Sequence, residues 1–148
     1  MTHSLIALFQ RDLAKLSQEL EAYPNEESLW VVAHDIKNPA GNLALHLVGN
    51  LNQFIGVVLG GTDFQRNRDA EFGSRDIPKA ELISMVQATS TMIESVLKDV
   101  TVFALEQPYP QEVLGYPMTT SYFLIHLYGH LNWHLGQINY HRRLTASN

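Results

Sequence analysis

The chain has 148 residues, of which 45% are hydrophobic and 17% are charged, and its formal net charge is −5. This length suits one domain with a substantial core, and the acidic balance argues against a nucleic-acid partner, which usually calls for a basic face. The chain has no cysteine, which excludes disulfides, thiolate metal sites and a cysteine nucleophile. Any metal must therefore be held by nitrogen and oxygen, and any thiol chemistry needs a thiol from a small molecule.

Apolar residues at helical spacing predict four long amphipathic helices, near residues 4–22, 39–59, 78–104 and 119–143. Asn38 as N-cap and Pro39 at the first helical position predict the start of the second helix, and Gly60 with Gly61 predicts its end. Residues 23–38 are a connection, either a single helical turn or an extended piece. The sequence predicts an all-α single domain, a four-helix bundle.

Residues 61–77 form a polar link without apolar periodicity. Seventeen residues is long for a link inside a compact domain, and a crossover between two helices that run the same way requires such a length. The interleaved arginines and acidic residues also suit anion capture or a dimer contact, while a solvated loop is the default interpretation.

Four of the seven histidines lie in the predicted last helix, at His126, His130, His134 and His141. Residues four apart on a helix are one turn apart, so His126/His130 and His130/His134 are the two pairs that can share one ion. His126 and His134 are roughly 12 Å apart along the axis, and His134 and His141 roughly 10 Å, which is too far for one ion. At 100° per residue, His134 and then His130 lie nearest the middle of the apolar stripe, so His130/His134 is the better inward-facing pair.

A third ligand is needed for a metal site, and His46 at the edge of the apolar stripe of the second helix is the candidate. The alternative is that these histidines are core residues that only hydrogen-bond a neighbour. His3, His34, His126 and His141 are not expected to bind the ion. Asn50 and Gln137 lie near His46 and His134 on their helices, so they are candidates to orient the ligands or to make structural polar contacts.

Two segments together resemble the DinB/YfiT-like superfamily, particularly a bacterial branch of it. They are NPAGNLALHLVGNL in the second helix and GHLNWHLGQINYHRRL in the last. The family pattern is a histidine in helix two and an H-x-x-x-H-x-G-Q run in helix four, which match His46, His130, His134, Gly136 and Gln137. The resemblance implies an up-down-down-up bundle with a long crossover after helix two, a three-histidine divalent metal site and a homodimer. Relatives include transferases and isomerases that use bacillithiol or mycothiol, and metal hydrolases.

Three neutral imidazoles would leave an ion with an open position, as in catalytic rather than structural sites. Zinc, nickel, iron and manganese all accept imidazole, and water or an exogenous thiol bound there becomes a nucleophile near neutral pH. The sequence thus predicts a metal-dependent thiol S-transferase or hydrolase acting on a small molecule; the alternative is a non-catalytic metal-binding or small-molecule-binding bundle. No segment is predicted to cross a membrane and no signal peptide is recognised, so we expect a cytoplasmic location.

Overall fold

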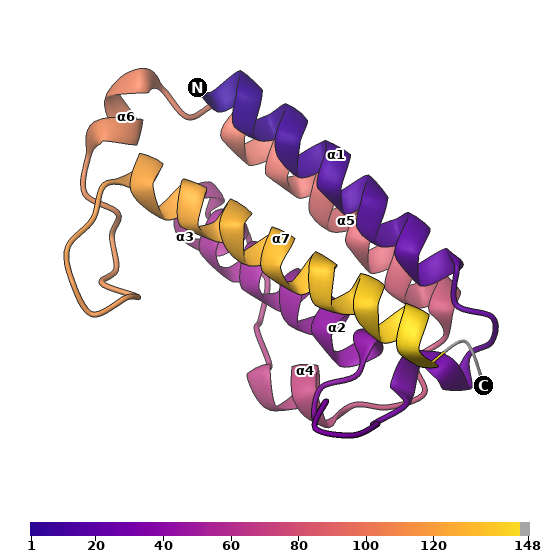
Figure 1. Ribbon diagram of the computed structural model, residues 1–148. Coiled ribbons are helices and arrows are strands. Elements are labelled where there is room, and N and C mark those ends of the chain that lie inside the picture. The colour runs from indigo at the N-terminus through magenta and orange to yellow at the C-terminus, as the bar shows by residue number, and fades with distance from the viewer. Residues whose placement is uncertain (146–148) are drawn as a thin grey trace.

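The computed structural model describes residues 1–145, and within that range the protein is all-α (Figure 1). The long helices are α1 (Thr2–Glu21), α2 (Ala40–Leu51), α5 (Lys79–Leu97) and α7 (Thr120–Thr145). The shorter elements are the 3₁₀ helix η1 (Glu27–Trp30), the π-helical turn η2 (Asn52–Val57), α3 (Val58–Gly60), α4 (Arg68–Gly73) and α6 (Val102–Glu106). Residues 1–145 contain no β-strand, only isolated bridges between Ala33 and Ile36 and between Pro108 and Thr119.

The long helices pack side by side, with α1 against α5 and α7, and α2 against the same two helices. Helices α1 and α7 run in one direction, and α2, α3 and α5 run in the other (Figure 1). Because α3 and α5 run the same way, the link 61–77 returns along the molecule and places α4 against α2.

Leucine and isoleucine side chains between the long helices form the core. Those at most 1% exposed include Leu13, Leu16 and Leu20 of α1, Leu47, Leu51 and Ile55 of α2 and η2, Ile93 and Leu97 of α5, and Leu131 and Ile138 of α7. Burying one such side chain stabilises the fold by about 1.5 to 3 kcal/mol. This packing holds α2 and α7 face to face, which sets the distance between their polar side chains.

The helical rod Ala40–Gly60 consists of α2, η2 and α3 without interruption. It ends where predicted, because Gly61 takes a left-handed conformation with φ 65°, which favours glycine, and Thr62 N–H then bonds the Gly56 carbonyl. The predicted start is one residue early, and Asn38 as N-cap is wrong. Pro39 occupies the cap position with extended ψ, and the helix begins at Ala40.

Two expectations about the middle of the chain are wrong. The predicted helix 78–104 ends at Leu97, because the N–H groups of Asp99 and Val100 bond carbonyls only three residues back, and Thr101 then caps the separate helix α6 through its Oγ1. The link 61–77 is not a fully solvated loop, since it contains α4, capped by Asn67 Oδ1 on the N–H of Ala70. Of the two alternatives for 23–38, η1 confirms a single helical turn.

Among the helices of residues 1–145, one meets the length and composition of a membrane span. This is the rod Ala40–Gly60, with a mean hydropathy of 1.4 over its best window. Half of that window is buried inside the protein, and core helices of soluble proteins meet the same criterion. The finding is therefore weak support for a membrane contact.

Candidate metal centre

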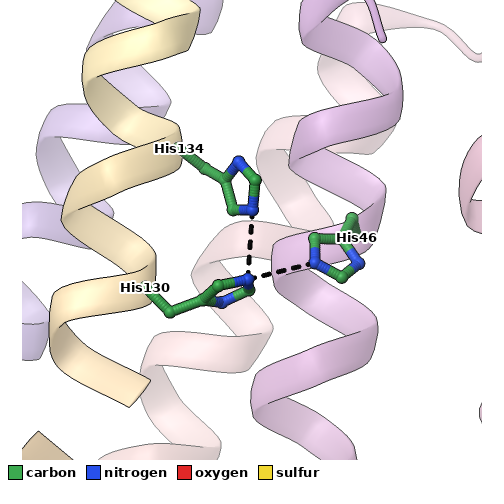
Figure 2. A group of neighbouring side chains, drawn as sticks. All are labelled: His46, His130 and His134. Carbon is green, nitrogen blue, oxygen red and sulfur yellow. Dashed lines mark hydrogen bonds between the residues drawn. The ribbon is translucent and has the colours of Figure 1, made fainter. Parts of the chain in front are cut away.

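Three histidine side chains meet between α2 and α7 (Figure 2). Nε2 of His130 lies 3.2 Å from Nε2 of His46 and 3.0 Å from Nε2 of His134. One potential ligand atom from each ring lies within 4.8 Å of the other two. Two nitrogens bound to one ion at about 2.0 to 2.1 Å would be roughly 2.8 to 3.4 Å apart for bond angles between 90° and 110°. The three histidines thus form a group that could hold a metal ion.

Glu71 of α4 fixes the orientation of His46, and the sequence analysis did not identify it. Its Oε1 lies 3.0 Å from Nδ1 of His46, and Arg66 binds both carboxylate oxygens at 2.8 and 2.9 Å. Glu71 is only 5% exposed. The arginine keeps this buried carboxylate ionised, and a carboxylate only accepts hydrogen bonds, so Nδ1 of His46 must carry the proton.

Gln137 has the same effect on His134. Its amide oxygen Oε1 lies 2.7 Å from Nδ1 of His134. An amide oxygen only accepts, so Nδ1 of His134 also carries its proton. In both rings the Nε2 atom is therefore left with a free lone pair, and both lone pairs face Nε2 of His130.

His130 cannot satisfy both neighbours. A neutral imidazole has one N–H, so Nε2 of His130 can donate to His46 or to His134 but not to both. Its Nδ1 is buried and has no hydrogen-bond partner. Buried polar atoms are normally paired, so an arrangement with more lone pairs than hydrogens is typical of a cation site.

Electrostatics keeps the three rings in the neutral form that binds metals. Burial, and then the neighbouring rings of His134 and His46, lower the pKa of His130 to about 4. Burial also lowers the pKa of His46 and of His134, although the hydrogen bonds to Glu71 and Gln137 oppose the effect. All three imidazoles are therefore uncharged at neutral pH.

The other histidines lie outside this group. His126, the member of the rival pair, is exposed and stacks on Phe123, with its ring centroid 6.4 Å from that of His130. His141 is buried near the end of α7 and hydrogen-bonded through both nitrogens. The polar neighbours also differ, because Gln137 contacts His134 as anticipated, whereas the buried Oδ1 of Asn50 has no partner.

Glu71 and Arg66 could not have been found from periodicity. Both lie in the polar link, and Glu71 reaches His46 only because α4 packs on α2 beside Gly49. A Cβ atom at Gly49 would overlap the Glu71 carboxylate. A glycine inside an apolar helix was thus the one signal in the sequence that something approaches closely at this point.

A cavity of about 450 Å³ adjoins the histidine group. Its walls come from residues 35–38, Leu43, and the α7 residues His134, Gln137, Tyr140 and His141. This volume lies within the range of small-molecule sites. Since His134 lines the cavity, a small molecule in it would lie beside one of the three histidines.

Comparison with protein-family models, with curated proteins and with solved structures gives no match in any of the three. The function must therefore be inferred from the geometry of the site.

Proposed function

We propose that His46, His130 and His134 hold one divalent ion, such as zinc, nickel, iron or manganese. The observation that carries the proposal is the convergence of three Nε2 atoms, two of which have tautomers fixed by Glu71 and Gln137 so that their lone pairs face one point. The chemistry of this donor set fits a borderline-soft divalent ion, because all three donors are neutral nitrogens.

The protein would contribute orientation and charge. Glu71 and Arg66 form an ion pair that holds the His46 ring, and the Phe72 ring packs against His46 with centroids 5.0 Å apart. Such outer groups raise ligand basicity and hold the ligand geometry. The ion would supply an open coordination position and would lower the pKa of water or a thiol bound there, which produces a nucleophile near neutral pH.

We further propose that the enzyme is a thiol S-transferase or hydrolase acting on a small molecule. The chain has no cysteine, so a thiol would come from a low-molecular-weight cosubstrate. The cavity beside His134 offers room for the substrate. The acidic charge supports a protein without a nucleic-acid partner, and a cytoplasmic location without membrane attachment completes the proposal.

The directions of α1, α2, α5 and α7 support an up-down-down-up four-helix bundle, with the link 61–77 as the crossover. This order and the motif around His46, His130, His134, Gly136 and Gln137 support membership of the DinB/YfiT-like superfamily. The membership stays a proposal that rests on this motif and on the arrangement of the helices.

One observation favours the alternative of a metal-binding bundle without turnover. The carboxylate nearest the histidines, Glu71, is occupied by Arg66 and His46, so it is not free to act as a general base. A reaction would then rely on a nucleophile activated by the ion alone.

The two functions are separated by assaying metal-loaded and metal-free protein with low-molecular-weight thiols and an electrophilic substrate. We expect product only with the loaded protein, unchanged rates for His126→Ala, and loss of the rate for His130→Ala. A full complement of metal without turnover on any thiol or on hydrolysable substrates would favour the binding bundle. Protein that takes up no metal would contradict both.

A further inference from the structure

The outward face of α7 carries a stripe of exposed apolar residues that no part of the described chain covers. The large members are Tyr122 (51% exposed), Ile125 (55%), Trp133 (69%), Tyr140 (65%) and Leu144 (58%). With Gly129 and Gly136 they recur at steps of three and four along one side of the helix, and we call this set the outer stripe. In Figure 1, α7 lies at the front with no helix over it.

The outer stripe is unusual because its helix lacks charge. From Thr120 to His141 the sequence has no Asp, Glu, Lys or Arg. A helix face that stays in water normally carries charged residues, and a contiguous exposed apolar patch marks an interaction site. We propose that the outer stripe is the interface of a symmetric homodimer, in which α7 packs antiparallel on α7 of a second copy.

The order of residue sizes in the stripe supports a second copy of this chain as the occupant. The sequence of the stripe is Tyr, Ile, Gly, Trp, Gly, Tyr, Leu, which is bulky at both ends with glycines on either side of a central tryptophan. Gly129 and Gly136 are centred on the same point as Ile125 and Tyr140, between Asn132 and Trp133. A two-fold axis at that point pairs each glycine with the other glycine of the second copy, and Ile125 with Tyr140. Such self-complementarity is required of a two-fold interface.

The two glycines have room for the partner. A Cβ atom at Gly129 or Gly136 would meet nothing within 4 Å, so both positions are open notches on the helix surface. Glycine lets two helix backbones approach closely, and the exposed Trp133 can then lie across the notch of the second copy. Aromatic residues in this role commonly carry most of the binding free energy of an interface.

The size of the stripe predicts a weak dimer. From Tyr122 to Leu144 the helix rises about 33 Å, and with a width of about 10 to 12 Å the footprint is roughly 350 Å². Standard interfaces bury about 800 Å² per partner. Tyr116 extends the surface, since its hydroxyl bonds the Tyr122 hydroxyl at 3.0 Å. We therefore expect a dissociation constant in the micromolar range.

Tyr140 connects this interface to the candidate site, because it belongs both to the outer stripe and to the wall of the cavity beside His134. Antiparallel packing would bring Ile125 of the second copy next to Tyr140. The second copy would then border the mouth of the cavity, so dimerisation and ligand access become linked.

The first test is the mass of the protein by sedimentation velocity, from micromolar to several hundred micromolar. We expect a concentration-dependent dimer for the unmodified chain, a monomer for Trp133→Glu, and unchanged behaviour for Phe103→Glu, a matched control in α6 that is 75% exposed. A monomer at every concentration would overturn the proposal, and so would a Trp133→Glu variant that still dimerises. Binding of a monomeric chain to lipid vesicles would overturn it in favour of a membrane surface.

The second test needs no disruptive change. The chain has no cysteine, so Asn132→Cys introduces a unique thiol beside the predicted two-fold axis. Mild oxidation should give disulfide-linked dimers, while Thr91→Cys on the exposed face of α5 should stay monomeric. Equal cross-linking of the two variants would show that the contact is random, which contradicts the proposed interface.

Discussion

Helix α7 holds two groups of inward-facing histidines, and they differ in how many ring nitrogens the protein satisfies. His141 is 1% exposed, with Nε2 2.8 Å from the Val31 carbonyl and Nδ1 2.7 Å from the Tyr23 hydroxyl. Both of its nitrogens are used, so it fastens residue 31 and the end of α1 to α7. His130 and His134, in contrast, share one region with more lone pairs than hydrogens. Hydrogen-bond accounting, rather than burial, separates a structural histidine from a candidate ligand.

The pKa shifts alone would not have separated the two groups. Burial lowers the pKa of His141 as it does that of His134, and the bond to Val31 opposes the shift. Both residues are therefore neutral near pH 7. What differs is the direction of the free lone pair, which for His134 faces two other imidazoles.

The largest effect in our first set of variants is expected at Glu71, which orients His46 without contacting the ion. Glu71→Gln removes the ion pair with Arg66 and the charge that fixes the His46 tautomer. Loss of such an outer partner typically lowers metal affinity 10- to 100-fold. Competition with a chelator of known affinity measures the change, and an affinity within twofold of the unmodified protein would contradict the role of Glu71.

A glycine pair tests the same role without changing any polar residue. Gly49→Ala places a Cβ where the Glu71 carboxylate lies, so it should displace Glu71 and reduce metal affinity by a similar factor. Gly73→Ala is the matched control, because a Cβ there meets nothing within 4 Å. If both variants bind metal equally well, close packing of Glu71 on α2 is not needed for the site.

A smaller effect, and one independent of metal, is expected for His141→Ala. This change leaves the Val31 carbonyl and the Tyr23 hydroxyl without their buried partner, which costs about 1 to 3 kcal/mol of unfolding free energy. Denaturant unfolding should show the loss both with metal and with a chelator. For His134→Ala, by contrast, the loss should vanish in chelator, because metal stabilises only the folded state that binds it. A chelator-sensitive effect of His141→Ala would contradict the distinction between the two groups.

The histidine group was largely predictable because it depends on local helical geometry. The spacing of His130 and His134 and their position relative to Leu131 and Ile138 follow from 100° per residue, and His46 lies on the buried side of another helix. Glu71 was not predictable, because its burial depends on how a polar link folds back onto α2.

The end of α5 shows the same limit. Apolar residues continue past Leu97 at helical spacing, yet the helix stops there and Thr101 starts a new one. Periodicity identifies which face is buried, but helix ends depend on which local hydrogen bonds form. The position of a helix end is therefore less determined by the pattern than its buried face.

The smallest effect is expected at a second satisfied polar contact of α7, between Tyr128 and the buried Asp12 of α1. The Arg11 guanidinium, at 2.7 Å, and the Tyr128 hydroxyl, at 2.6 Å, accept its charge and hold the pKa of Asp12 at about 2, below its ordinary value near 4. A lowered folded-state pKa stabilises the protein above pH 4, and the stabilisation is lost as the pH falls through about 2. Asp12→Asn should thus cost about 1 to 2 kcal/mol at pH 7, and the difference from the unmodified chain should shrink below pH 4. Urea unfolding across this range measures it, and a constant difference would contradict the assignment.

The most direct measurement of the central claim is the metal content of untagged protein for two single variants, His134→Ala and His126→Ala. Both residues lie one turn from His130, so the two changes are equivalent in sequence spacing and differ only in which side of α7 they face. We predict about one divalent ion per chain for the unmodified protein and for His126→Ala, and little or none for His134→Ala. The reverse pattern would show that His126 and His130 form the pair, and a metal content that neither change alters would show that these histidines only pack in the core.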